Sequence, residues 1–182
     1  MQITVISILQ PFASLVVMGA KKIETRSWNT EFRGELYIHA SLGKDYGPEK
    51  LSCRELCYKE PFKQFINCGL AYDKLPFGKI IGKVNMVGTF AMNDAMLGKG
   101  VTFKNQIWEF SNEELSFGDF SCDRHGWLFS NPVQFAYPIQ AKGKQGFWNY
   151  DLPDQFNYQT ADGAHLSFSS PPPKKILNIL SK

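Results

Sequence analysis

The chain has 182 residues and a formal net charge of +3, with 43% hydrophobic and 20% charged residues. This length and composition predict one globular domain with room for a core. A pI near 8.6 permits a phosphate-bearing partner but is too modest to indicate a surface for duplex nucleic acid. No stretch approaches the roughly 20 apolar residues of a membrane span and no signal peptide is present, so we expect a cytoplasmic chain without a membrane partner.

The four cysteines do not suggest a metal site. Cys53, Cys57, Cys68 and Cys122 include no C-x-x-C pair. Cys53 and Cys57 would lie one helical turn apart as buried or half-buried thiols. We therefore predict no metal and no cofactor, and a reducing intracellular compartment.

The first 41 residues predict strand, helix, strand and strand. Residues 1–8 are rich in Ile and Val and suit a first barrel strand. Pro11 suits a first helical turn and Gly19 a helix end, so a short helix is expected between them. In the next strand, residues 23–28, alternation places Glu24, Arg26 and Trp28 on one face. In the strand 33–41, Tyr37 and His39 should share the face opposite the core.

The middle of the chain predicts a helical insertion at residues 48–69, with a helix start at Pro48 and a break at Pro61. Residues 79–90 are the clearest later strand, in which Gly82 and Gly88 indicate bulges or a close backbone approach. Residues 108–119 carry four acids and no Lys or Arg. We expect them to form a rim loop or short helix away from any anion path, although Glu109, between Trp and Phe, is an alternative pocket acid.

The last part of the barrel is expected from residues 125–130 and 134–141, two strands separated by a turn at Asn131 and Pro132. Residues 142–148, K-G-K-Q-G-F-W, then combine cations, glycines and rings in a loop that suits an anion or an unstacked base. Beyond residue 151 the composition becomes polar and then proline-rich, and residues 174–182 form a short amphipathic stretch. We expect a C-terminal extension, docked or partly flexible.

The run Gly19, Lys21, Glu24 and Arg26, spaced G-x-K-x-x-E-x-R, resembles the signature of the ASCH family. Q-P-F-A-S at 10–14, R-G-x-L-x-I-H-A-S at 33–41, N-P-V at 131–133 and the 142–148 loop are similar to family segments in the same order. The resemblance implies an α+β fold, a PUA-like small mixed β-barrel with flanking short helices. The barrel domain would span residues 1–150, with the insertion at 48–69 and the extension at 151–182.

The resemblance also implies a ligand, since ASCH domains are associated with RNA or nucleotide-like molecules. The residues agree with a cleft for single-stranded RNA, a nucleotide or a modified nucleoside. We expect a floor of Lys21, Glu24 and Arg26. The remaining candidates supply cations (Arg33, Lys142, Lys144), ring faces (Trp28, Trp148, with Tyr37 and Trp127), hydrogen-bonding edges (Gln10, Gln145) and one wall residue (His39).

Two other function classes remain open. A bacterial ASCH relative hydrolyses acetylcytidine with a lysine, a threonine and a glutamate. Its lysine corresponds to Lys21, but its threonine corresponds to Glu24, and Thr25 would face the other side of the strand. Lys21 and Glu24 are therefore the catalytic candidates of a possible amidohydrolase. In the third class, a non-catalytic effector-binding or protein-interaction module, the tail would supply the contacts.

Overall fold

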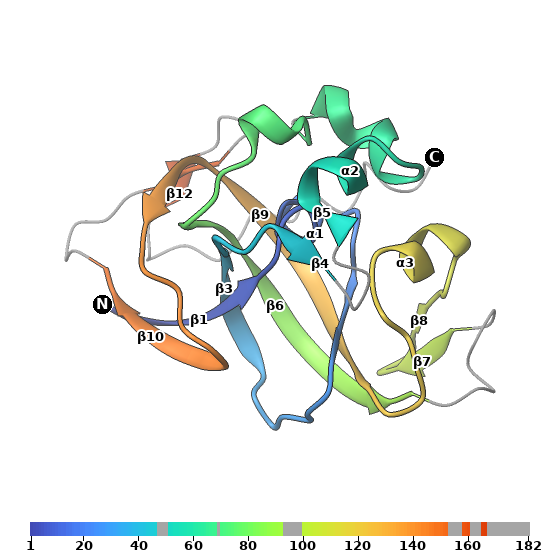
Figure 1. Cartoon of the computed structure of the whole chain (residues 1–182). Coiled ribbons are helices and arrows are strands. Elements are labelled where there is room, and N and C mark those ends of the chain that lie inside the picture. Colours follow the sequence, from blue (N-terminus) through green and yellow to red (C-terminus); the bar gives the residue numbers. More distant parts are fainter. Residues whose placement is uncertain (47–50, 69, 93–99, 153–157, 161–164, 167–182) are drawn as a thin grey trace.

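The computed structural model describes residues 1–46, 51–68, 70–92, 100–152, 158–160 and 165–166 (Figure 1). The first half contains β1 Gln2–Ile8, α1 Phe12–Val17, β2 Ile23–Arg26, β3 Gly34–Ala40, β4 Asp45–Tyr46, β5 Leu51–Ser52, α2 Cys53–Cys57, η1 Phe62–Cys68 and η2 Tyr72–Lys74. The second half contains β6 Lys79–Ala91, β7 Val101–Phe103, β8 Gln106–Trp108, α3 Asn112–Ser116, β9 His125–Gln140, β10 Phe147–Asp151, β11 Tyr158–Gln159 and β12 His165–Leu166.

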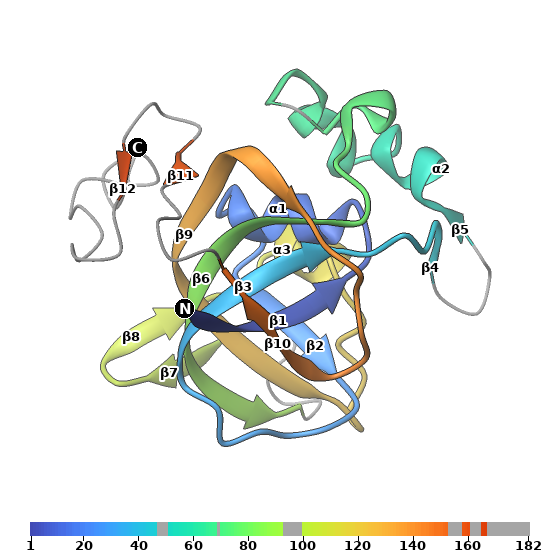
Figure 2. The ribbon, with the colours of Figure 1, turned by 90° about the vertical axis from the view of Figure 1, so that its left-hand side faces the viewer.

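One curled sheet forms the centre of the molecule, with strand order β10-β1-β3-β6-β9-β2. The β1–β3 pairing is parallel and the other pairings in this sheet are antiparallel. The sheet wraps into a half-barrel with α1 at one opening (Figure 2). The predicted α+β class, a small mixed barrel with short helices, is confirmed. Among the described helices, none is long and apolar enough to cross a membrane.

The helix α1 begins and ends where its sequence predicts. Pro11 is its N-cap, and the Gln10 side chain accepts the Ser14 N–H at 3.1 Å. Gly19 takes φ +80°, a conformation that suits glycine, and the backbone N–H groups of Ala20 and Lys21 then return to Leu15 O. The helix is followed at once by the turn that carries the charged motif.

The strand β9 corrects one prediction. The sequence predicts two strands, at residues 125–130 and 134–141, but a single strand runs from His125 to Gln140. Asn131 has φ +49° and the pairing with β6 shifts register nearby, so the chain bends without leaving the sheet. The predicted close approach at Gly82 is confirmed, because a Cβ there would lie 2.2 Å from Val133 O.

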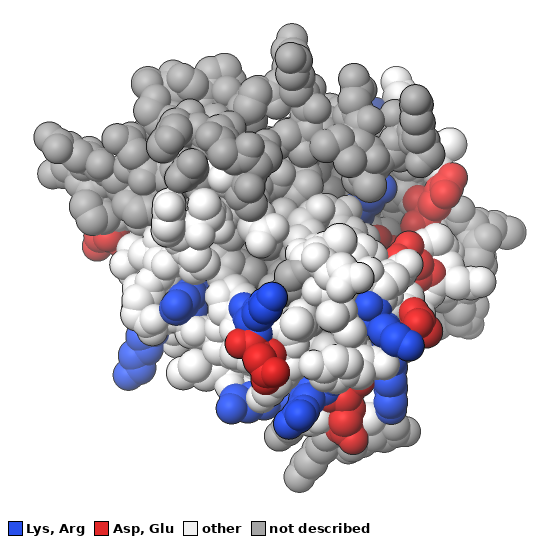
Figure 3. Space-filling view, turned by 90° about the horizontal axis from the view of Figure 1, so that it is seen from above, with Lys and Arg blue, Asp and Glu red and all other residues white. Residues whose placement is uncertain are grey.

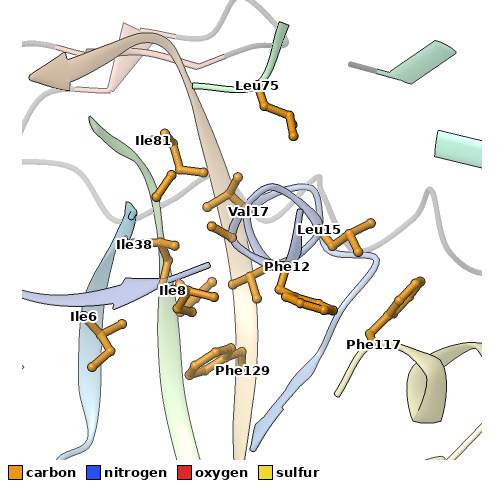
Figure 4. Close-up of a cluster of buried hydrophobic side chains, with 14 of the residues drawn as sticks. Ile6, Ile8, Phe12, Leu15, Val17, Ile38, Leu75, Ile81, Phe117 and Phe129 are labelled. Atoms are coloured by element: carbon orange, nitrogen blue, oxygen red, sulfur yellow. The ribbon is translucent and has the colours of Figure 1, made fainter. Parts of the chain in front are cut away.

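In the described part of the chain, buried hydrophobic side chains form three clusters. The largest surrounds α1, where Phe12 and Leu15 face Phe117 on one side and strand residues such as Ile8 on the other (Figure 4). A second cluster contains Tyr37 and Trp148 and covers the opposite face of β3. Residues Leu36 to Ala40 are therefore all buried, so the expectation that Tyr37 and His39 lie on an uncovered face is wrong.

In the segment predicted as a helical insertion, the structure has β5, α2 and η1. Ser52 and Glu55 form a capping box at the start of α2, and Cys53 and Cys57 are buried on one face of it. The predicted helix start at Pro48 lies outside the described residues. So does most of the C-terminal extension, including the stretch 174–182.

Candidate functional site

The motif lysine is buried rather than presented to solvent. Lys21 is 1% exposed, and its ammonium donates to Ile23 O at 2.5 Å. Its Nζ lies 3.6 Å from Glu24 Oε2. A Cβ on Gly118 would lie 3.2 Å from the same Nζ, so the segment after α3 covers it. A ligand has no direct access to Lys21 in this arrangement.

A carboxylate from α3 closes the other side of the motif turn. Glu114 is buried, and its Oε1 and Oε2 accept the backbone N–H groups of Lys22 and Ile23 at 3.0–3.3 Å. Burial raises the pKa of Glu114, and the Lys21 charge and the two N–H bonds oppose that rise. The acidic segment, which does contain a short helix, therefore packs on the turn that carries Lys21.

The motif charges lead from the interior to the surface. Glu24 lies between Lys21 and Arg26, with its Oε1 3.0 Å from Arg26 Nε. The contact between Glu24 Oε1 and Arg26 Nε does not have the geometry of a hydrogen bond, so we describe it as an ion pair. The Arg26 side chain is 23% exposed and lies 5.8 Å from the Trp127 ring centroid. Arg26 is the point at which the buried charges reach solvent.

Ser7, at the end of β1, joins the motif strand to the 142–148 loop. Its backbone carbonyl accepts a hydrogen bond from Arg26 Nη2 at 2.9 Å, and its Oγ lies 3.0 Å from Lys144 O. The same Oγ accepts the Trp148 Nε1–H at 3.2 Å. Two cationic segments more than 100 residues apart in sequence therefore meet at one serine.

The His39 ring lies behind this serine. His39 is buried, with Nδ1 3.1 Å from Ser7 Oγ and Nε2 3.2 Å from Ala141 O. A carbonyl oxygen only accepts, so Nε2 carries the hydrogen of the neutral ring, and Nδ1 and Lys144 O are alternative acceptors for the single Ser7 hydroxyl hydrogen. Burial lowers the pKa of His39, and the bond to Ala141 opposes the shift. We assign His39 to the support of the loop.

The aromatic side chains between the two segments pack on one another. Trp127 and Phe147 stack with ring centroids 5.3 Å apart, and Trp28 lies edge-on to both, at 4.6 Å from Trp127 and 5.4 Å from Phe147. Trp127 and Tyr37 are fully buried, so no base can stack on their rings. Trp148 is also buried, whereas Trp28 is half-exposed.

The other predicted residues are divided between fold and surface. Gln10 is buried, and its amide nitrogen donates to Pro76 O at 3.3 Å while its oxygen caps α1, so its polar groups serve the fold. Lys142, Lys144 and Gln145 are exposed on the loop. Arg33 is exposed too, but its guanidinium is held by Thr30 O, Phe32 O and Thr89 Oγ1 at the β2–β3 connection. None of these three contacts links it to Ser7.

A cavity of about 680 Å³ opens beside the motif turn. It contacts Gly19 and Lys22 on one side and Glu109, Glu113 and Glu114 on the other. Three carboxylates facing one ammonium would repel a phosphate. The predicted floor residues Lys21, Glu24 and Arg26 do not line this cavity. Glu109, the alternative pocket acid, does line it.

The residues of the hydrolase alternative are close together but enclosed. Lys21 Nζ and Thr25 Oγ1 each lie 3.2 Å from the position that a Cβ on Gly118 would take. Both atoms therefore lie beside Gly118. Both side chains are buried, and Glu24 is held by the two neighbouring cations. Within the described residues, no group of three His, Cys, Asp or Glu side chains could hold a metal.

Sequence reasoning missed two residues that organise the site. Ser7 lies near the end of the predicted first strand, residues 1–8, and no sequence pattern distinguishes it. Glu114 has a weak signal, since Ser111 and Glu114 have the S-x-x-E spacing of a helix start, and Ser111 Oγ does accept the Glu114 N–H at 3.1 Å. That spacing predicts the helix but not the direction of the Glu114 carboxylate.

One family model matches half of the chain. The model of the ASCH domain family matches residues 6–97. Activating signal cointegrator 1 of Mus musculus and that of Homo sapiens are each 29% identical over 146 residues, which is 80% of this chain and 22% of theirs. The chain thus spans about a fifth of the length of these curated relatives.

Solved structures of ASCH from Zymomonas mobilis are also similar. One is 12% identical, with a TM-score of 0.44 over 80% of this chain and 85% of that chain. A mutant form of the same protein gives 13% identity and a TM-score of 0.42 over the same shares.

Proposed function

This chain belongs to the ASCH domain family, and from that premise we propose that it binds single-stranded RNA or a modified nucleoside. The contact surface, here called the Arg26–Lys144 face, comprises Arg26, Trp28, Lys142, Lys144 and Gln145. These are the members of the predicted cleft that lie near Ser7 or on the adjoining loop and retain exposure. The remaining residues of the predicted cleft either position these five side chains or stabilise the fold.

The observation that carries the proposal is the double use of Ser7. Because its carbonyl binds Arg26 and its hydroxyl lies against Lys144 O, the guanidinium and the loop are both held at the end of β1. Arg26 offers a planar fork suited to phosphate, and the loop lysines offer mobile point charges. A backbone with spaced phosphates matches such a pair of segments.

The buried part of the motif positions Arg26. Lys21 neutralises Glu24, and Glu24 in turn holds the Arg26 guanidinium at 3.0 Å. The ring of Trp127 supports the same guanidinium from behind. Lys21 and Glu24 are thus positioning residues, and an arginine fixed in this way loses less side-chain entropy when it binds a ligand.

The scale of the charge favours a short ligand. Basic and acidic side chains are interspersed on the molecular face shown in Figure 3, with no continuous basic stripe over its described residues. Duplex-binding domains are usually more basic than a pI of 8.6 indicates. A half-exposed Trp28 supplies one stacking surface, and stacking contributes about 1–3 kcal/mol per base.

The test is a titration of fluorescently labelled ten-residue RNA by anisotropy at several salt concentrations. We expect Lys144→Gln and Arg26→Gln to weaken binding, and each lost phosphate contact to reduce the slope of log K against log salt by about 0.7. Lys63→Gln, an exposed lysine in η1, is the matched control and should behave as wild type. Equal affinity and slope in all four proteins would refute the proposal.

A further inference from the structure

A second cavity, of about 320 Å³, lies where the β7–β8 hairpin folds against β3 and β6. We call it the hairpin cavity. Its polar lining comes from Arg33, Asn85, Lys104, Gln106 and Trp108, and its apolar lining includes Phe103. Neither the family comparison nor the RNA-binding proposal assigns it a role, and no residue of the Arg26–Lys144 face lines it.

The charge of this lining has one sign. Among the described residues, two cations, Arg33 and Lys104, line the cavity and no carboxylate does. The Arg33 guanidinium is fixed by bonds to Thr30 O at 3.0 Å, Phe32 O at 2.7 Å and Thr89 Oγ1 at 3.1 Å. These bonds use Nη1 and Nη2 of the guanidinium, and none of the three uses Nε. A fixed arginine beside a second cation is suited to an anion.

The hairpin places Lys104 at this wall. Lys104 and Asn105 have φ +48° and +63°, the left-handed pair that makes a two-residue hairpin turn. Phe103 is held against β6, because a Cβ on Gly88 would lie 2.6 Å from its ring. Lys104 Nζ lies 5.5 Å from the same ring centroid. The turn and the glycine together define one side of the cavity.

A buried donor in the lining has no acceptor in the described part of the chain. Trp108 is 4% exposed, and its Nε1–H makes no hydrogen bond there. Burying an indole N–H without a partner is unfavourable, and native proteins seldom do so. The amides of Asn85 and Gln106 line the same cavity. Trp108 Nε1 is itself enclosed and does not open into the cavity, so a ligand with acceptors on a flat ring would use the two amides.

We propose that the hairpin cavity binds a small anion that carries a hydrogen-bonding ring, of the size and chemistry of a nucleoside monophosphate. Arg33 and Lys104 bind the phosphate, and the ring edge meets the two amides beside Trp108. A volume of about 320 Å³ is at the lower end of ligand pockets, which hold roughly 300–1,000 Å³. One nucleotide, not a strand, suits that volume.

The experiment follows the tryptophan indole signals of the ¹⁵N-labelled full chain by NMR. The Trp108 signal is identified with Trp108→Phe, and the probes are the four ribonucleoside 5′-monophosphates, cytidine and inorganic phosphate. We expect at least one monophosphate to shift the Trp108 indole signal to saturation. Cytidine and phosphate should bind about tenfold or more weakly, as expected when one charge-assisted hydrogen bond is lost.

Two variants locate the binding. Lys104→Asn keeps a residue that tolerates positive φ and removes the ammonium, so it should weaken monophosphate binding about tenfold without opening the hairpin. Lys144→Gln should leave it unchanged. The proposal is overturned if no monophosphate shifts the Trp108 signal, if inorganic phosphate binds as tightly as the nucleotides, or if Lys144→Gln weakens binding and Lys104→Asn does not. This last result would move mononucleotides to the Arg26–Lys144 face.

Discussion

Replacing Lys21 with alanine should destabilise the protein and not merely weaken a ligand contact. The ammonium is buried, donates to Ile23 O and lies 3.6 Å from Glu24 Oε2. Its charge also acts on the buried Glu114 carboxylate. Removing the lysine leaves both carboxylates without their shared cation.

The size of the effect depends on burial. Removing one partner of a buried ion pair costs about 3–5 kcal/mol, since the charge left behind stays desolvated. For a chain of this length, we expect Tm to fall by about 6–20 °C, at about 2–4 °C for each kcal/mol. Glu24 keeps Arg26 as a second partner, which favours the lower half of this range.

Urea unfolding followed by circular dichroism measures the free energy directly. Lys22→Ala is the matched control, because Lys22 is the next residue, is exposed, and keeps its hydrogen bonds to Glu114, which come from the backbone N–H. It should change the free energy of unfolding by no more than about 0.5 kcal/mol. If Lys21→Ala and Lys22→Ala unfold at the same urea concentration, the ammonium contributes no stability and the structural role assigned to the motif lysine is wrong.

Two further substitutions test the groups around the motif. Glu114→Ala should lower the free energy of unfolding by about 3 kcal/mol, because two backbone N–H groups lose a charged acceptor. Glu113→Ala, on the exposed side of α3, should lower it by less than about 1 kcal/mol. Similar urea midpoints for the two variants would count against the Glu114 contact. Burial raises the pKa of Glu114 above its ordinary value of 4.5, because the ionised carboxylate is less stable in the fold than in the unfolded chain. The free energy of unfolding should therefore decrease as the pH rises from 4.5 toward the raised pKa. Glu114→Gln should not show this decrease. The pKa of His39 is lowered from 6.5, so its contribution is complete above pH 6.5 and is lost as the pH falls toward the lowered value, with a slope of at most about 1.4 kcal/mol per pH unit. The difference in free energy of unfolding between wild type and His39→Gln should therefore shrink between pH 7.5 and pH 5, and a constant difference would show that the ring titrates normally.

Local sequence patterns were sufficient to predict the ends of the secondary-structure elements near the site. Pro11 and Gly19 delimit α1 because each residue restricts or releases the backbone at its own position. The close approach at Gly82 was predictable for the same reason. The order of the family motifs likewise placed Lys21, Glu24 and Arg26 in one turn and strand.

The tertiary structure decided which of these groups reach solvent. Alternation along β3 indicates which side chains share a face, but not that a second cluster covers the face of Tyr37 and His39. Lys21 is enclosed because α3, about 90 residues later, brings Glu114 and Gly118 against it. No local pattern reports such a contact.

The same limit explains β9 and Ser7. Asn131 and Pro132 have the composition of a turn, yet pairing with β6 on both sides of them keeps the chain in the sheet. Ser7 gains its role only when β1 lies beside β3 and β10, which brings His39, Trp148 and Lys144 to one hydroxyl. The sequence by itself determined which residue types were available and where the backbone turns. Long-range packing alone decided their burial and partners, because those depend on segments that are distant in the chain.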